Sequence, residues 1–257
     1  MSPRESPLAS SWIRRYAPAP EAPARLVCLP HAGGSATFYS GLARRLAPDT
    51  EVLAVQYPGR LERRAEPPMK DLAALAEALV TELTPWTDRT FALFGHSLGA
   101  MVAFETARRL EAMGRPPVAL FVSGRGAPSR HRREFGPQLD DATLLQQMRR
   151  LGGTDPRIFA DEDLMRLALP VIRADYHMVE DYRYVPSPPL TCPVTALNGR
   201  TDPKVSSADV DAWRDHTTAS FDSLVFPGGH FYLVDRSKEV TAALTDRLSR
   251  ITGSPRP

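Results

Sequence analysis

The stretch that decides the fold is FALFGHSLGAMVAFE, residues 91–105. Its first residues, 91–94, form a short apolar run typical of a buried strand, and a helix is predicted over residues 100–113, before Gly114. Gly95-His96-Ser97-Leu98-Gly99 lies between them and matches the pattern G-x-S-x-G. In a strand–turn–helix unit, the glycines of this pattern permit a tight, strained turn that exposes the serine hydroxyl. The stretch therefore predicts a serine nucleophile at residue 97.

Similar apolar runs occur on both sides of this unit, and turns or helical patterns separate them. They are residues 26–29, 52–55, 118–122, 194–197 and 224–226. Apolar residues at helical spacing predict further helices over residues 71–83 and 237–251. Because the strands lack polar alternation, they are typical of a parallel sheet that is covered on both faces. The predicted fold class is α/β, with a doubly wound, mostly parallel sheet.

The alternation of strands and helices stops between residues 127 and 189. Two amphipathic helices are predicted in this segment, near residues 140–151 and 161–184, and no strand is predicted there. Pro170 is expected to kink or split the second helix, because proline has no backbone N–H. We predict that residues 127–189 form a helical lid over the C-terminal edge of the sheet.

Residues 1–24 are rich in Pro, Ser and Ala and are predicted to form a loose arm, with Trp12 and Tyr16 as possible anchors. The α/β core then comprises residues 25–126 and 190–257. The first residues lack the continuous apolar segment of a signal peptide. No apolar run in the chain approaches the roughly 18 residues of a membrane span. A cytoplasmic location is therefore expected.

The composition excludes several classes of protein. Hydrophobic residues make up 42% of the chain and charged residues 24%, which argues against a disordered or fibrous chain. The formal net charge of +2 gives no reason to expect nucleic-acid binding. Cys28 and Cys192 lie in apolar, strand-like segments, so we expect two buried thiols in a reducing compartment.

A serine nucleophile needs a base, and His230 is the best candidate among the histidines that follow Ser97. The others are His131 and His177, in the predicted lid, and His216, in a polar segment. His230 follows a late strand and the pair Gly228-Gly229. A loop at that position reaches the edge of the sheet where Ser97 is expected.

The base needs a carboxylate that orients it, and the order Ser, Asp, His along the chain favours Asp202. Asp202 comes just after the strand predicted over residues 194–197. Some proteins of this fold carry the acid one strand earlier, but residues 118–128 contain no Asp or Glu. Asp209 and Asp211 lie further along the chain and are poorer candidates.

The developing oxyanion needs two backbone N–H donors. One is expected from Leu98, directly after the nucleophile. The other is expected from Ala32, in the loop Pro30-His31-Ala32-Gly33-Gly34, whose small residues let the backbone approach a substrate. His31 is expected to shape this loop rather than to take part in the reaction.

Several blocks of the chain together carry a resemblance that extends from about Trp12 to the final helix. They are RLVCLPHAGGSA, VLAVQYPGRLER, FALFGHSLGAMVAFE, LFVSGRGAP, DYRYVPSPPLTCPVTALNGRTDPKV and FPGGHFYL. The chain resembles the stand-alone (type II) thioesterases of polyketide and nonribosomal peptide synthetases, in the α/β-hydrolase superfamily. Many members have Met where this chain has Leu98, but only the backbone N–H of that residue is needed.

The resemblance implies hydrolysis of acyl groups from the phosphopantetheine arm of carrier proteins, in an editing role. It also implies the triad Ser97, Asp202 and His230. No cofactor or metal of the enzyme's own is expected, because the phosphopantetheine belongs to the carrier. The alternative enzyme is a broad carboxylesterase or acyl-CoA thioesterase with the same triad. A carrier-binding protein with an inactive hydrolase fold is disfavoured, because every member of the triad is present.

Two further features bear on the partner. Asp222-Ser223-Leu224 resembles the pantetheine attachment site of a carrier, but its flanking residues do not fit and it runs into a predicted strand. A basic cluster lies at the start of the predicted lid, at Arg125, Arg130, Arg132 and Arg133. Charge runs are usually solvated surface. The functional alternative is that some of these arginines contact an acidic carrier or the pantetheine phosphate.

Overall fold

The computed structural model describes residues 10–133, 140–152, 159 and 161–253, and seven strands in this part of the chain form one sheet. The strands are β1 (Ile13–Arg14), β2 (Ala24–Leu29), β3 (Thr50–Val55), β4 (Thr90–His96), β5 (Leu120–Ser123), β6 (Val194–Gly199) and β7 (Phe221–Phe226). Their order in the sheet is β1-β3-β2-β4-β5-β6-β7. Neighbouring strands pair in parallel except β1, which is antiparallel to β3. The predicted fold class is confirmed.

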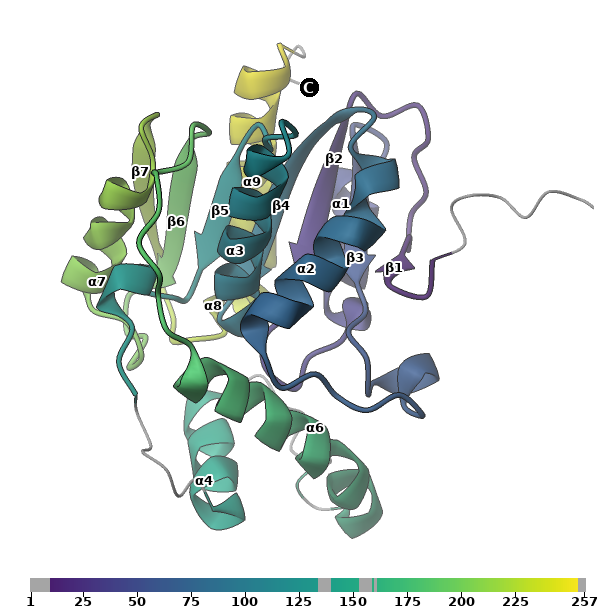
Figure 1. Cartoon of the computed structure of the whole chain (residues 1–257), viewed down its shortest axis with the longest axis vertical. Helices are drawn as coiled ribbons and strands as arrows, with labels where there is room; N and C mark the ends of the chain where they lie inside the picture. Colours follow the sequence, from purple (N-terminus) through teal and green to yellow (C-terminus); the bar gives the residue numbers. More distant parts are fainter. Residues whose placement is uncertain (1–9, 134–139, 153–158, 160, 254–257) are drawn as a thin grey trace, which may run out of the picture.

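Helices cover both faces of the sheet, as the apolar runs predicted (Figure 1). The α-helices are α1 (Ser40–Leu46), α2 (Leu72–Leu83), α3 (Leu98–Ala112), α4 (Asp141–Leu151), α6 (Glu162–Asp181), α7 (Ser207–Asp211), α8 (Tyr232–Asp235) and α9 (Ser237–Thr252). The 3₁₀ helices are η1 (Ala36–Tyr39), η2 (Leu61–Arg63), η3 (Thr84–Trp86), η4 (Pro128–Arg130) and η5 (Ala212–His216). One apolar core lies under α2 and α3, and a second lies under α1 and α9. No described helix is long and apolar enough to cross a bilayer.

The inner strands are mostly apolar in sequence and buried on both faces, and the charged residues that they bury, Arg25 of β2 and Glu51 of β3, form an ion pair at 3.3 Å. Every residue of β2, β3, β5 and β6 is buried. β7 differs, since it is the last strand of the sheet and most of its residues are half-buried or exposed. Asp222, Ser223 and Leu224 lie within this strand and pair with β6. The segment that resembles a pantetheine attachment site is therefore a strand.

Between β5 and β6 the chain forms α4 and α6, which lie beyond the C-terminal ends of the parallel strands (Figure 1). Pro170, which the sequence predicts to kink or split the second helix, does not split it. The helix α6 runs from Glu162 to Asp181 with Pro170 inside it. Pro170 faces solvent, so water can satisfy the carbonyl that its missing N–H leaves free, while Val171 and Ile172 beside it are buried.

The segment predicted as a loose arm contributes an edge strand to the sheet. β1 pairs with β3, and Gln56 N–H donates to Trp12 O at 2.7 Å. The Trp12 ring lies under the guanidinium of Arg63, 4.1 Å from the ring centroid. A two-residue strand is too short to show alternation in the sequence, which explains the difference. Residues 1–9 of the predicted arm lie outside the described residues.

Both cysteines are free and buried. Cys28 lies in β2, and Cys192 lies two residues before β6. Burial raises the pKa of both thiols, that of Cys192 to about 12. The thiolate, which is the reactive form, is therefore disfavoured at both positions.

Candidate functional site

Ser97 occupies the turn between β4 and α3 with φ 56° and ψ −115°. A positive φ is unusual for a residue with a side chain, and here it turns the serine out of the strand. The two glycines of the motif make the turn possible. A Cβ atom on Gly95 would lie 2.0 Å from Gly99 O, and one on Gly99 would lie 2.0 Å from Leu29 O. The motif is therefore a steric requirement of this turn.

His230 and Asp202 are in direct contact. His230 Nδ1 lies 2.8 Å from Asp202 Oδ2, and both side chains are buried. The second carboxylate oxygen, Oδ1, accepts the Lys204 N–H at 2.9 Å, so both oxygens of Asp202 have a partner. The alternatives, Asp209 and Asp211, lie on α7, where Asp209 forms a capping box with Ser206. Of the three aspartates considered, Asp202 is the one that contacts His230.

The loops that carry Asp202 and His230 are joined by their backbones. Thr201 N–H donates to Gly228 O at 3.0 Å, and Arg200 N–H donates to Phe226 O at 2.8 Å. A Cβ atom on Gly199 would lie 2.1 Å from Gly229 O, so only glycine allows the two loops to approach this closely. The relative position of the acid and the base is thus fixed by main-chain contacts.

Ser97, His230 and Ala32 line one narrow pocket of about 50 Å³. The pocket lies between the edge of the sheet and the two inserted helices, which contribute Met148, Leu151, Tyr176 and Val179. Within the described residues, no hydrogen bond joins Ser97 to His230. Such contacts often tighten only when substrate binds. The structure thus brings Ser97, His230 and Ala32 to one pocket, with Asp202 behind His230.

The two expected oxyanion donors come from different elements. Leu98 is the first residue of α3, and a residue at this position has no acceptor within the helix for its N–H. Ala32 lies in a turn that Gly34 N–H closes by donating to His31 O at 2.9 Å. Because a peptide unit is planar and trans, the Ala32 N–H points away from the bonded His31 carbonyl.

Three imidazoles lie together beside Ser97, which the sequence did not predict. The ring centroid of His96 is 4.9 Å from that of His230 and 5.9 Å from that of His31. Burial, together with the charge of His230, lowers the pKa of His31 to about 3 and that of His96 well below its usual value. Both are therefore neutral near pH 7. No group of three His, Cys, Asp or Glu side chains that could hold a metal occurs among the described residues.

His96 is also the start of a buried polar chain. Its Nδ1 lies 3.0 Å from Ser123 Oγ, which lies 2.7 Å from the Tyr232 hydroxyl. Ser123 O accepts the Ser97 N–H at 2.8 Å, so the same residue also holds the turn. His96 is a variable position of G-x-S-x-G, and Ser123 and Tyr232 come from distant segments, so the motif alone gave no signal for them.

Comparison with known proteins is consistent with this geometry. Residues 24–248 match the family model described as the thioesterase domain. The chain belongs to the thioesterase family. Thioesterase PikA5 of Streptomyces venezuelae is 49% identical to it over 246 residues, which are 95% of this chain and 88% of that protein.

Solved structures give the same result. The type II thioesterase BorB of the borrelidin biosynthetic cluster is 49% identical with a TM-score of 0.86, covering 92% of this thioesterase and 97% of BorB. YbtT, a type II thioesterase of the yersiniabactin NRPS/PKS biosynthetic pathway, is 32% identical with a TM-score of 0.81, covering 94% and 100%. The expectation of an editing, type II thioesterase of polyketide and nonribosomal peptide synthetase systems is confirmed.

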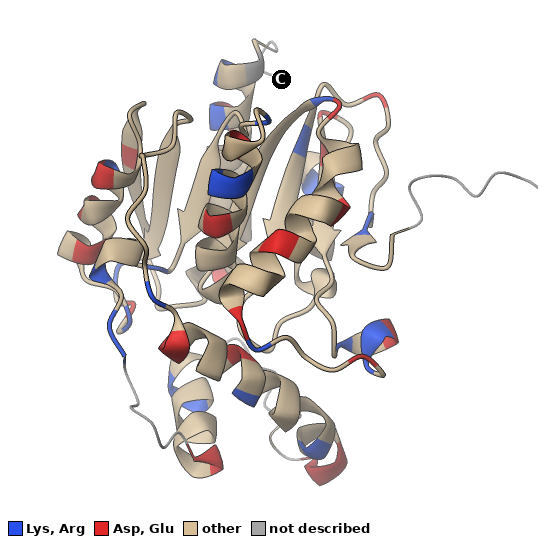
Figure 2. Ribbon diagram, in the orientation of Figure 1, with Lys and Arg blue, Asp and Glu red and all other residues tan. Residues whose placement is uncertain are grey.

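Next to the Ser97 pocket, this thioesterase has a second, basic cavity of about 420 Å³. Its basic residues are Arg125, Arg130, Arg132, Arg150 and Lys204, and the rest of its lining includes Asp209, His131 and Gln147. Arg125 and Lys204 line both cavities. The basic residues between β5 and α4 run along this side of the molecule (Figure 2). Arg133, which the sequence grouped with them, instead contacts Asp181 at 3.1 Å.

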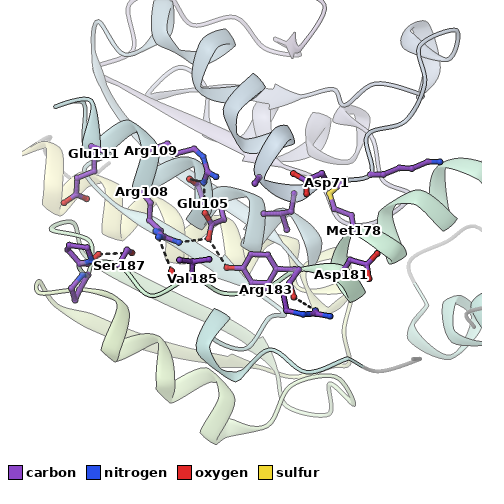
Figure 3. Close-up of a pocket in the computed structure, with 17 residues that line it drawn as sticks. Asp71, Glu105, Arg108, Arg109, Glu111, Met178, Asp181, Arg183, Val185 and Ser187 are labelled. Carbon is purple, nitrogen blue, oxygen red and sulfur yellow. Dashed lines mark hydrogen bonds and ion pairs between the residues drawn. The ribbon is translucent and has the colours of Figure 1, made fainter. Parts of the chain in front are cut away.

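A larger cavity, of about 720 Å³, lies elsewhere, between α2, α3 and the chain that follows α6 (Figure 3). Its central carboxylate, Glu105, is paired with Arg108 at 2.8 Å, Arg109 at 2.6 Å and the Tyr182 hydroxyl at 2.9 Å. None of the residues expected to act in catalysis lines this cavity. The hydrogen bond from Tyr182 to Glu105 links the residue that follows α6 to α3.

Proposed function

We propose that Ser97 is the nucleophile, His230 the base and Asp202 the orienting acid of a thioester hydrolase that acts on acyl groups carried by phosphopantetheine. The Ala32 and Leu98 N–H groups stabilise the oxyanion. The observation that carries this proposal is the buried Asp202–His230 pair, whose histidine lines the same pocket as the strained Ser97 turn. This arrangement is that of a serine–histidine–aspartate triad.

Acylation begins when Ser97 Oγ attacks the thioester carbonyl carbon and its proton moves to His230 Nε2. The carbonyl electron pair moves onto the oxygen, which the two backbone N–H groups stabilise. Collapse of this intermediate breaks the C–S bond, and the leaving sulfur takes the proton from His230. A water molecule then attacks the acyl-serine, with His230 again as base, and releases the carboxylic acid and Ser97.

Asp202 acts by holding the imidazole. Because His230 Nδ1 faces Asp202 Oδ2, the proton of the neutral ring resides on Nδ1, and Nε2 is free to accept the proton of Ser97. The same contact stabilises the imidazolium that forms in each half of the reaction. Asp202 is itself held by the Lys204 N–H, which fixes the carboxylate that orients the ring.

We propose that residues 127–189 act as a lid on a core of residues 25–126 and 190–257. A pocket of about 50 Å³ suits short acyl groups. Its apolar side chains from α4 and α6 shelter the acyl chain from water. Apolar contacts discriminate by only about 1–3 kcal/mol per methylene, so broad tolerance among short acyl chains is expected.

We propose that carrier proteins dock beside the lid, with the phosphate of phosphopantetheine in the basic cavity. Arginine is suited to phosphate because its guanidinium offers a planar pair of donors. The cavity adjoins the Ser97 pocket through Arg125 and Lys204. A cytoplasmic location remains our proposal, in line with the two free thiols.

The test of the function is turnover of a matched pair of substrates, an acyl carrier protein and the acyl-CoA with the same acyl group. The Ser97→Ala variant should lose about 10⁴–10⁶-fold in kcat on both, because the triad acts as a unit. A serine-directed fluorophosphonate should label Ser97 in the wild-type protein alone. More than a tenth of wild-type turnover in Ser97→Ala would contradict the assignment. Equal kcat/KM on both substrates would favour the broad acyl-CoA thioesterase.

The docking proposal is tested by reversing three arginines, in the variant Arg130→Glu, Arg132→Glu, Arg150→Glu. KM for the acyl carrier should rise and become less sensitive to salt, while a small acyl-cysteamine thioester is turned over as before. The matched control is Arg44→Glu, Arg236→Glu, Arg250→Glu, which changes net charge equally at exposed positions away from the cavity. Equal loss on both substrates would show that the cluster supports the fold, and the docking proposal would be dropped.

A further inference from the structure

The loop that carries Ala32 is bound to α6 by a buried aspartate. Asp175, near the C-terminal end of α6, is 1% exposed, and its Oδ2 accepts the Gly33 N–H at 2.7 Å. The same oxygen forms an ion pair with the guanidinium of Arg60, which is 6% exposed. Arg60 and Asp175 are separated by more than a hundred positions in the sequence, so no local motif contains both.

Arg60 connects the same loop to the chain that follows β3. Its Nε donates to Gly34 O at 3.0 Å, and its Nη1 donates to Pro58 O at 2.7 Å. Behind it, Gln56 Nε2 donates to Arg60 O at 3.3 Å, and Gln56 Oε1 accepts the Ala36 N–H at 3.0 Å. Together with the ion pair to Asp175, each of the three guanidinium nitrogens of Arg60 thus has an acceptor, as a buried guanidinium requires.

The backbone of the loop is also in steric contact with α6. Gly33 has a φ of +73°, and a Cβ atom there would lie 2.9 Å from Ile172 Cγ1. A positive φ at the third residue of a turn is typical of type II, in which glycine is favoured. The N–H of this same glycine is the one that Asp175 accepts. The turn on which Ala32 sits is therefore fixed at Gly33 by Asp175 and at Gly34 by Arg60.

We propose that Asp175 and Arg60 are positioning residues for the oxyanion hole. Neither touches the reacting atoms. Their buried pair holds the turn from His31 to Gly34 so that the Ala32 N–H points at the substrate carbonyl oxygen in the transition state. Oxyanion donors act by preorganisation, so a small displacement of the turn lowers the rate without removing the donor. This inference rests on the proposed role of Ala32.

A consequence is that α6 cannot move away from the core without moving the oxyanion loop. Entry of substrate by displacement of the lid must then involve α4 rather than the part of α6 around Asp175. The helix α4 packs its buried Leu144 and Met148 with Ile172 of α6 in a separate small cluster.

The test compares Asp175→Asn with the wild type on S-propionyl-N-acetylcysteamine and on an alkyl trifluoromethyl ketone. The ketone forms a reversible adduct with Ser97, and its oxygen then occupies the oxyanion hole. Complete loss of one donor typically costs about 10²–10³-fold in kcat. For a displaced donor we expect roughly a 10–100-fold fall in kcat, a change of KM below about threefold, and at least about a tenfold rise in Ki for the ketone.

Arg173→Gln is the matched control, because Arg173 lies on the same helix, two residues from Asp175, and pairs with Asp141 at the surface. It should leave kcat, KM and Ki within about twofold of the wild type. In the double variant Asp175→Asn, Arg60→Gln, the fall in kcat should be smaller than the product of the two single falls, because the two residues share one ion pair and hold neighbouring parts of the same turn.

Both KM and Ki are independent of the concentration of active enzyme, so a partly unfolded sample does not imitate the expected result. If Asp175→Asn does not fold, Arg60→Lys, which keeps the charge but not the fork of donors, is subjected to the same measurements. An unchanged Ki, or equal rises in KM and Ki, overturns the proposal. Failure of the triad assignment is recognised separately, by turnover in Ser97→Ala.

Discussion

The sheet edge and the helical insertion form opposite sides of the pocket, and different groups hold them in place. At the sheet edge, main-chain hydrogen bonds between neighbouring turns fix the geometry, such as Ser97 N–H to Ser123 O at 2.8 Å. The insertion is held by side chains. The helix α6 is bound through Asp175, whereas the described ion pair between α4 and α6, Asp141–Arg173, is about 45% exposed at both residues.

The proposed catalytic residues therefore lie on the firmly held sheet edge, whereas entry of substrate is expected to depend on the helical insertion. Within the insertion, α6 behaves as part of the core, because its end is also bound to α3 through Tyr182 and Glu105, and Met178 packs in the core under α2 and α3 (Figure 3). The helix α4 contributes Leu144 and Met148 to a separate cluster with Ile172. We therefore expect catalysis to be most sensitive at the sheet edge and stability to be least sensitive at α4.

The largest expected effect is at the sheet edge. His230→Ala should lower kcat about as much as Ser97→Ala, by about 10⁴–10⁶-fold, because the nucleophile and the base act as a unit. Asp202→Asn should cost less, roughly 10⁴-fold, since the imidazole then loses its orienting carboxylate. The measurement is kcat on a small acyl thioester with purified variants, whose fold is checked by circular dichroism.

The matched control is Asp209→Asn, at another aspartate close to the site that does not contact His230. It should retain turnover near that of the wild type. Near-normal activity in Asp202→Asn combined with loss in Asp209→Asn or Asp211→Asn would contradict the assignment of the acid.

The sheet edge could be predicted from the sequence more fully than the contacts of the helical insertion. The glycines at 95 and 99 are required by backbone contacts within one turn, so a local pattern marked Ser97. Asp202 and His230 each follow a strand, and the C-terminal ends of parallel strands meet at one edge. Their presence at the same edge as Ser97 could therefore be expected from the sequence.

The contacts that hold the insertion could not be predicted in this way. Asp175 and Arg60 lie on a helix and a loop that meet only in the folded chain, and neither has a local pattern that marks it. The same holds for Arg150 and Lys204, which complete the basic cavity from α4 and from the turn after β6. The sequence indicated a basic cluster, but it included Arg133, which pairs with Asp181 instead.

Stability at the sheet edge should depend on pH, because two of the histidines whose pKa burial lowers lie there. His31 and His96 are neutral in the folded protein, whereas in the unfolded chain a histidine has a pKa of about 6.5. Below that pH the unfolded state binds more protons. The free energy of unfolding should fall as pH drops from about 6.5, by up to about 1.4 kcal/mol per pH unit for each histidine.

Urea unfolding at pH 7.5, 6.5 and 5.5 measures this slope. His216, whose pKa burial also lowers, contributes with the same sign. The variant His96→Gln removes one of the three groups, so its free energy of unfolding should fall less between pH 6.5 and 5.5 than that of the wild type. An identical slope in the two proteins would show that His96 is not buried in its neutral form.

The smallest effect is expected at the ion pair between α4 and α6. Arg173→Gln removes an exposed pair, which typically contributes less than about 0.5 kcal/mol, and its effect should shrink further at high salt. The comparison variant is Glu105→Gln, at the contact between α3 and the end of α6.

Glu105→Gln leaves Arg108, Arg109 and the Tyr182 hydroxyl without their buried carboxylate. Breaking a fully buried pair costs about 3–5 kcal/mol, but both arginines retain some exposure, so about 2 kcal/mol is expected. Urea unfolding with linear extrapolation distinguishes the two values. If Arg173→Gln destabilises the protein as much as Glu105→Gln, then α4 is as firmly attached as α6, and the proposed route of substrate entry past α4 is wrong.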